Sequence, residues 1–194
     1  MKKLLAMVIL LMTVFIRLCY CLDNSIVKKC DHCHSQQAVT TNQKVPYLGG
    51  QHKSYFIKQL HDMKEHRLHC PLQKAAQIAF LDDKDMDDLA DYYAKLPLLK
   101  RRKVKINSLG KLLYTRGDNG KGIIACVICH GPSGKGNPAS FPMIAGLNRQ
   151  YIIEELYAFK RAKRRNDLNH VMQSICNKMS PDDIKALAQY IENL

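Results

Sequence analysis

One short motif occurs twice in this chain, and it limits what the chain can bind. Residues 30–34 read Cys-Asp-His-Cys-His, and residues 126–130 read Cys-Val-Ile-Cys-His. Each copy places two thiols three residues apart, with an imidazole directly after the second thiol. Both copies therefore predict a ligand that uses two sulfur atoms and one histidine nitrogen together.

The surroundings of the two motifs repeat as well. A proline follows the last histidine of each motif by twelve residues, and a tyrosine follows each proline by nine. These matched positions are Pro46 and Pro142, and Tyr55 and Tyr151. Self-similarity at a fixed offset indicates a duplicated structural unit. We therefore predict two copies of one module, at 22–97 and 109–194, joined by a basic linker at 98–108.

Both modules are predicted to be helical. Apolar residues recur at helical spacing over residues 55–63 and 151–159. The last helix of each module begins at a capping residue that an acidic residue follows three positions later. These pairs are Asp82 with Asp85, and Ser180 with Asp183. No stretch alternates apolar and polar residues over the length of a strand, so the predicted fold class is all-α.

The N-terminus is predicted to be an export signal. Two lysines precede an apolar run of thirteen residues, Leu4 to Ile16. Such a run suits a signal peptide and is short for a membrane-spanning helix. Cleavage after Cys21 would leave Leu22 as the first mature residue, and retention of residues 1–21 as an uncleaved anchor is the alternative. In both cases we expect the folded part to lie in the periplasm.

The chain is strongly basic, with a formal net charge of +13. Loss of residues 1–21 would remove three cations, Lys2, Lys3 and Arg17, and no carboxylate. The remaining excess gathers at 99–105 and 160–165. A basic surface favours an acidic protein partner or an anionic membrane surface, and export argues against a nucleic-acid partner.

Three chemistries use two cysteines at this spacing. A redox disulfide would accompany a βαβ pattern, which is not visible here. A structural zinc site would need two cysteine pairs within about twenty residues of each other, whereas these pairs are far apart. Covalent haem needs two thiols for its vinyl groups and a histidine for its iron. The chain holds no Trp and only five Phe, so haem would also help to fill the cores of two small modules. We therefore predict two covalent haem c groups.

The predicted attachment residues follow from the motifs. Cys30 and Cys33 would hold the first haem, and Cys126 and Cys129 the second. His34 and His130 would be the proximal ligands of the two irons. Haem iron has a further axial position, which a Met often fills in an electron carrier. Four methionines at apolar module positions are expected to pack in the core instead: Met63, Met86, Met143 and Met179.

The chain resembles a cytochrome c of the dihaem c-four type over nearly all of its predicted mature part. The resemblance is strongest from "GKLLYTRGDNGKGIIACVICHGPSGKG" to the C-terminus. The Arg-x-Asn-Asp pattern of that family fits residues 164–167, which places the family's axial methionine on Met172. Pro46 and Pro142 match the family's loop proline, whose carbonyl holds the other nitrogen of the proximal histidine. The resemblance implies two tandem class I cytochrome c domains.

The first module departs from the family pattern. It has no Met in the stretch that corresponds to Met172. Lys74 is predicted to be the substitute, because a deprotonated amine on a long side chain can bind iron. His69, Cys70 and a site with no protein ligand are the alternatives. Cys70 and Cys176 are otherwise read as free thiols or as a disulfide.

The resemblance implies an electron carrier rather than an enzyme. Electrons would pass between respiratory complexes, from a donor such as a bc complex to an acceptor such as a terminal oxidase. One alternative is a dihaem enzyme, or enzyme subunit, that acts on a small sulfur compound at the haem without a Met ligand. Another is a subunit or anchored module of an oxidase complex.

Overall fold

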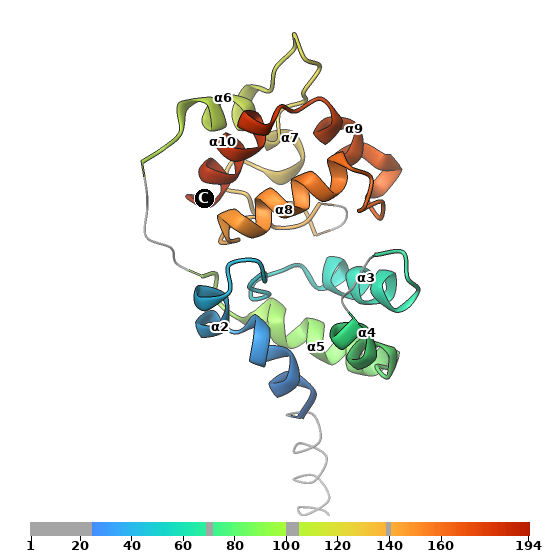
Figure 1. The fold of residues 1–194 in the computed structure, drawn as a ribbon. Coiled ribbons are helices and arrows are strands. Elements are labelled where there is room, and N and C mark those ends of the chain that lie inside the picture. The colour runs from blue at the N-terminus through green and yellow to red at the C-terminus, as the bar shows by residue number, and fades with distance from the viewer. Residues whose placement is uncertain (1–24, 69–71, 100–104, 139–140) are drawn as a thin grey trace, which may run out of the picture.

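The computed structural model describes residues 25–68, 72–99, 105–138 and 141–194, with the side chains of residues 72–74 left undescribed. These residues form helices and two isolated β-bridges, without a β-strand. The prediction of an all-α fold is confirmed. The helices gather in two groups, one above the other in Figure 1. The predicted boundaries at 22–97, 98–108 and 109–194 stay a prediction, and residues 1–21 lie outside the described part.

The first group of helices contains the first cysteine motif. Residues 25–34 are helical, and the next helices are α2 (Gln36–Thr41), α3 (Lys53–Lys64), α4 (Leu72–Ala79) and α5 (Asp83–Lys95). Helices α3 and α5 supply most of the core, which is centred on Phe56, Met86 and Tyr93. Cys30 packs against this core from the first helical segment. The apolar centre of the module therefore reaches the predicted attachment residues.

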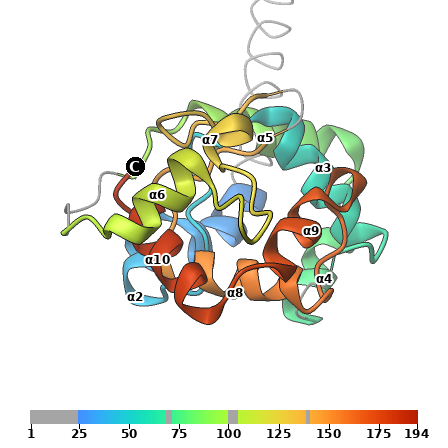
Figure 2. The ribbon, with the colours of Figure 1, turned by 90° about the horizontal axis from the view of Figure 1, so that it is seen from above.

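The second group repeats this arrangement around the second motif. Its helices are α6 (Ser108–Arg116), α7 (Val127–His130), α8 (Arg149–Lys160), the 3₁₀ turn η1 (Leu168–His170), α9 (Val171–Asn177) and α10 (Pro181–Ile191). Helix α6 crosses α10 very closely at Gly110. A Cβ atom at this position would lie only 2.0 Å from the Ala186 carbonyl oxygen, so only glycine fits. Figure 2 shows this crossing from above. The first and last helices of the second module therefore pack tightly against each other.

The predicted caps of the last helices are present in both modules. Asp82 and Asp85 form a capping box at the start of α5, and Ser180 and Asp183 form one at the start of α10. The residues on the inner faces of these helices are all buried: Met86, Leu89, Ala90, Tyr93, Ile184, Leu187, Ala188 and Ile191. The methionines predicted to pack are buried or partly buried in the cores.

Equivalent residues of the two modules make equivalent contacts across the junction between them. The buried Asn148 donates from Nδ2 to the Val39 carbonyl oxygen at 3.1 Å. At the positions related to these by the repeat, His52 Nε2 lies 2.7 Å from the Lys135 carbonyl oxygen. Exchanged contacts of this kind are the signature of a two-fold relation. The modules therefore meet through the same surface, with α3 facing α8 (Figure 1).

A second set of polar contacts holds the segment after α8 against α3. Arg164 donates from Nη2 to the Tyr55 hydroxyl at 2.8 Å and to Gln59 Oε1 at 3.1 Å. Asn166 Nδ2 donates to Asp62 Oδ2 at 2.7 Å. Burial by itself would raise the pKa of Asp62, but hydrogen bonds with Lys58, Asn166 and Arg67 outweigh it and lower that pKa. The junction is therefore built largely from paired polar groups.

Candidate haem sites

The second cysteine motif forms a single helical turn. Cys126 precedes α7, and Cys129 and His130 lie within it, so both thiols and the imidazole come from one turn. His130 is buried, and its Nδ1 lies 3.0 Å from the Pro142 carbonyl oxygen. A carbonyl oxygen can only accept, so Nδ1 carries the proton and Nε2 carries the lone pair. That tautomer is the one in which Nε2 can bind a metal.

The first motif has matching geometry. Cys30, Cys33 and His34 lie in the helical segment 25–34. His34 Nδ1 is 2.9 Å from the Pro46 carbonyl oxygen, a contact that again assigns the proton to Nδ1. Two independent turns thus present a pair of thiols beside an imidazole held by a proline carbonyl.

The protonation states of these groups suit a buried, apolar site. Burial lowers the pKa of His130 by more than the contact with Pro142 raises it, which favours the neutral ring that binds iron. Burial also raises the pKa of the Cys126 thiol to about 11. Neither cysteine pair forms a disulfide. Two thiols for vinyl groups and one neutral imidazole for iron are the donors that covalent haem needs, so the residues fit that group.

Met172 lies on the same core as the second motif. It is partly buried and packs, like Cys126, against the apolar cluster around Leu113, Ile152 and Ile184. Met172 is in the first turn of α9. Its backbone nitrogen donates to Asp167 Oδ2 at 2.8 Å. The mostly buried Asp167 carboxylate thus fixes the start of the helix that carries Met172.

The side chains predicted as the substitute ligand of the first module lie outside the described part of the structure. His69 and Cys70 lie outside the described residues. Lys74 is a residue of α4, but its side chain is likewise outside the described part. The Lys74 assignment and its alternatives stay predictions. Cys176 is a buried free thiol in the core of the second module, where burial raises its pKa to about 12.

Two features near these sites were not predicted from the sequence. Arg164 was counted in a basic surface cluster, but its side chain is 11% exposed and is bonded across the module junction. Asp31, inside the first motif, accepts hydrogen bonds from Tyr92 and Tyr93. The sequence does show one difference that points to Asp31, because the equivalent position of the second motif is the apolar Val127.

Comparisons with known proteins agree with this geometry. The sequence model of the family "Cytochrome c" matches residues 109–194. Cytochrome c4 of Azotobacter vinelandii is 32% identical over 176 residues, which cover 85% of this chain and 84% of that protein. The thiosulfate dehydrogenase electron acceptor of Stutzerimonas stutzeri is 33% identical, over 88% of this chain and 81% of the relative.

A solved structure shows the same architecture. The crystal structure of reduced recombinant cytochrome c4 from Pseudomonas stutzeri superposes with a TM-score of 0.79 and 29% sequence identity. The match covers 89% of this chain and 97% of that one. The cysteine motifs therefore belong to two class I cytochrome c domains with covalently bound haem c, and not to zinc or redox-disulfide sites. The chain is a member of the dihaem cytochrome c4 family.

Proposed function

We propose that this protein is a periplasmic carrier that takes electrons from one respiratory complex and delivers them to another, with a terminal oxidase as acceptor. The observation that carries the proposal is the pair of motif turns, each with its histidine Nδ1 about 3 Å from a proline carbonyl oxygen. Both turns lie in modules that share one junction. Two haems held in this way suit electron transfer, and family membership supports the carrier role.

The cysteines and the last histidine of each motif have defined roles in this proposal. Cys30 and Cys33 attach the first haem, and Cys126 and Cys129 attach the second. His34 and His130 bind the irons through Nε2, and Pro46 and Pro142 fix the rings. Haem supplies the one-electron chemistry, and the protein controls the environment in which it occurs. Met172 is proposed as the axial ligand of the second haem, and Lys74 as that of the first.

The Asp167 carboxylate is expected to hold Met172 in place for this role. Asp167→Ala removes the acceptor of the Met172 and Gln173 backbone N–H groups, at 2.8 and 3.2 Å. Loss of a helix-capping side chain costs about 1 kcal/mol. The Met–iron absorption band should therefore disappear at a lower temperature than in the wild-type protein, as followed by visible spectroscopy during heating.

Asp182→Asn is the matched control, because that side chain is 88% exposed on α10. It should leave the temperature at which the band disappears unchanged. A band in Asp167→Ala as heat-resistant as that of the wild type would show that Asp167 does not position Met172.

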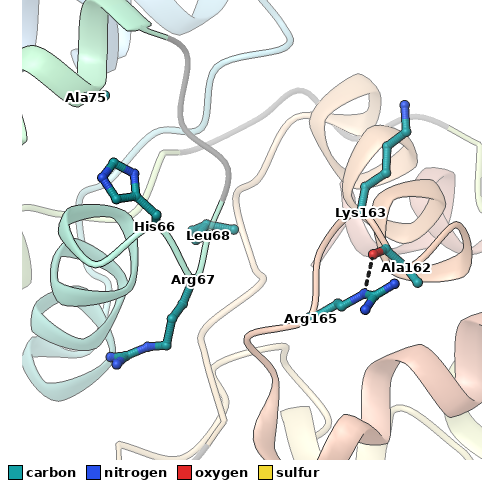
Figure 3. A pocket seen from close by; sticks show the side chains of 7 residues that line it. All are labelled: His66, Arg67, Leu68, Ala75, Ala162, Lys163 and Arg165. Carbon is teal, nitrogen blue, oxygen red and sulfur yellow. Dashed lines mark hydrogen bonds between the residues drawn. The ribbon is translucent and has the colours of Figure 1, made fainter.

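Exposed basic residues gather beside the module junction. A pocket of about 290 Å³ there is lined by His66, Arg67, Leu68, Ala75, Ala162, Lys163 and Arg165 (Figure 3). Lys163 and Arg165 are exposed, and residues 100–104 of the other predicted cluster lie outside the described part. Exposed cations can steer an acidic redox partner, and salt screens that attraction.

The carrier proposal is tested by oxidation of the reduced protein with membranes that contain a terminal oxidase. The rate should be high at low salt and fall steeply as ionic strength rises. Lys163→Glu with Arg165→Glu should lower both the rate and its salt dependence. Lys185→Glu, at an exposed position on α10, is the control and should change the rate less. Membranes that do not oxidise the protein would contradict the proposal.

A second candidate function is a dihaem enzyme that acts on a small sulfur compound. It is favoured by the relative named as a thiosulfate dehydrogenase electron acceptor. That name describes an acceptor of electrons, which fits a carrier better than an enzyme. Mixing the oxidised protein with thiosulfate separates the two candidates. Reduction of haem by thiosulfate alone indicates an enzyme, and reduction only after a thiosulfate dehydrogenase is added indicates a carrier.

A further inference from the structure

The two motif turns differ in charge at one equivalent position. Asp31 lies between Cys30 and Cys33, and the repeat places Val127 at the corresponding point of the second turn. Tyr93, which bonds to Asp31, packs in the same core as Cys30, so the Asp31 carboxylate lies near the Cys30 sulfur and near any group bonded to it.

Two tyrosines of α5 hold the Asp31 carboxylate in place. The Tyr93 hydroxyl donates to Oδ1 at 2.8 Å, and the Tyr92 hydroxyl donates to Oδ2 at 3.1 Å. Tyr93 is fully buried and stacks on Phe56, with 5.3 Å between the ring centroids. Burial, and then the hydrogen bond to Asp31, raise the pKa of Tyr93, so its hydroxyl stays a donor. Both Asp31 oxygens are acceptors, which is the role of an ionised carboxylate.

The charge of Asp31 already acts on the predicted attachment atom. Burial, and then the Asp31 carboxylate, raise the pKa of the Cys30 thiol to about 11. The exposed Lys29 opposes this effect more weakly. A negative charge that disfavours a thiolate also favours the more positive state of a nearby redox centre. For haem that state is ferric iron, so such a charge lowers the reduction potential.

We propose that the Asp31 carboxylate, held by Tyr92 and Tyr93, lowers the reduction potential of the first haem relative to the second. Electrons then enter at the first haem and rest on the second. The inference depends on the proposed attachment of haem at Cys30 and Cys33. It is independent of the group that fills the sixth position of the first iron.

The test is a potentiometric titration of the haem-loaded full chain that resolves both haems. Asp31→Asn keeps a side chain of the same shape and removes the charge. It should raise the midpoint potential of the first haem and leave that of the second unchanged. Asp83→Asn, which removes a 91% exposed carboxylate from the same module, should change neither. Tyr93→Phe removes one hydrogen bond and keeps the Asp31 charge, so it should not raise the potential of the first haem.

Three outcomes would overturn the proposal. The first is an unchanged midpoint potential of the first haem in Asp31→Asn. The second is an equal rise of that potential in Asp83→Asn. The third is an equal rise in Tyr93→Phe, which would make the role of Asp31 structural. If Asp31→Asn does not retain its haem, Val127→Asp gives the converse test. A carboxylate added there should lower the potential of the second haem, and an unchanged value would refute the idea. Failure of the carrier role would appear separately, in the assay with membranes, without any effect on these potentials.

Discussion

Replacing Cys126 and Cys129 together with alanine is expected to remove one of the two covalent haems and leave the other attached. Both thiols belong to one helical turn, and the first motif supplies its own pair in the other module. The attachments should therefore be independent. The mass of the denatured chain should fall by one haem, and the double replacement of Cys30 and Cys33 should give the same loss at the other site.

Cys176→Ala provides the control for this experiment. Cys176 is a free thiol that packs in the same core as Cys126, but it belongs to neither motif. The variant should keep both haems after denaturation. A chain without Cys126 and Cys129 that still carries two covalent haems would contradict the assignment of the motif cysteines.

Helix positions and much of the core could be predicted from the sequence because local patterns determine them. The capping pairs at Asp82 and Ser180 are local signals, and the apolar periodicity that follows each of them matches the buried face of α5 and of α10. The haem motif is equally local, since its three donors fall within five residues. Family resemblance added Met172 and the role of the two prolines, whose positions the repeat had already matched.

Contacts between the modules could not be predicted in this way. Arg164 looked like one member of a basic run, because nothing in the run shows which cation faces Tyr55 and Gln59 from the other module. The placement of Asp31 between Tyr92 and Tyr93 depends on how α5 packs against residues 25–34, more than sixty positions away in the chain. Such features depend on tertiary packing, which overrides local preference.

Replacing Arg164 with methionine is expected to cost the protein about 3 kcal/mol of stability, the loss typical of a broken buried ion pair. Arg164 forms an ion pair with Glu155, and its guanidinium lies 4.7 Å from the centre of the Phe159 ring. Burial by itself would lower the pKa of Arg164, but Tyr55 and Glu155 outweigh it and raise that pKa, so the group stays cationic. Methionine keeps the apolar packing and leaves the carboxylate unpaired.

Urea unfolding of the haem-loaded protein measures this loss. Arg165→Met removes a neighbouring cation that is exposed and bonded only to the Ala162 carbonyl oxygen among the described contacts, so it should shift the midpoint little. An equal midpoint for Arg164→Met and the wild type would show that the contacts of Arg164 contribute nothing to stability.

A double-mutant cycle with Tyr55→Phe shows whether the hydrogen bond between Arg164 and Tyr55 contributes to the stability that Arg164→Met removes. Tyr55 belongs to the first module and Arg164 to the second, and their contact is a 2.8 Å hydrogen bond across the junction. If that contact contributes, Arg164→Met should cost less in the Tyr55→Phe background than in the wild type, because part of the interaction is already absent. Additive costs would instead assign the effect of Arg164 to its other partners, which are Gln59 across the junction and Glu155 and Phe159 within the second module. Coupling would mean that the two modules stabilise each other through Arg164, which lies in the segment that leads to Met172.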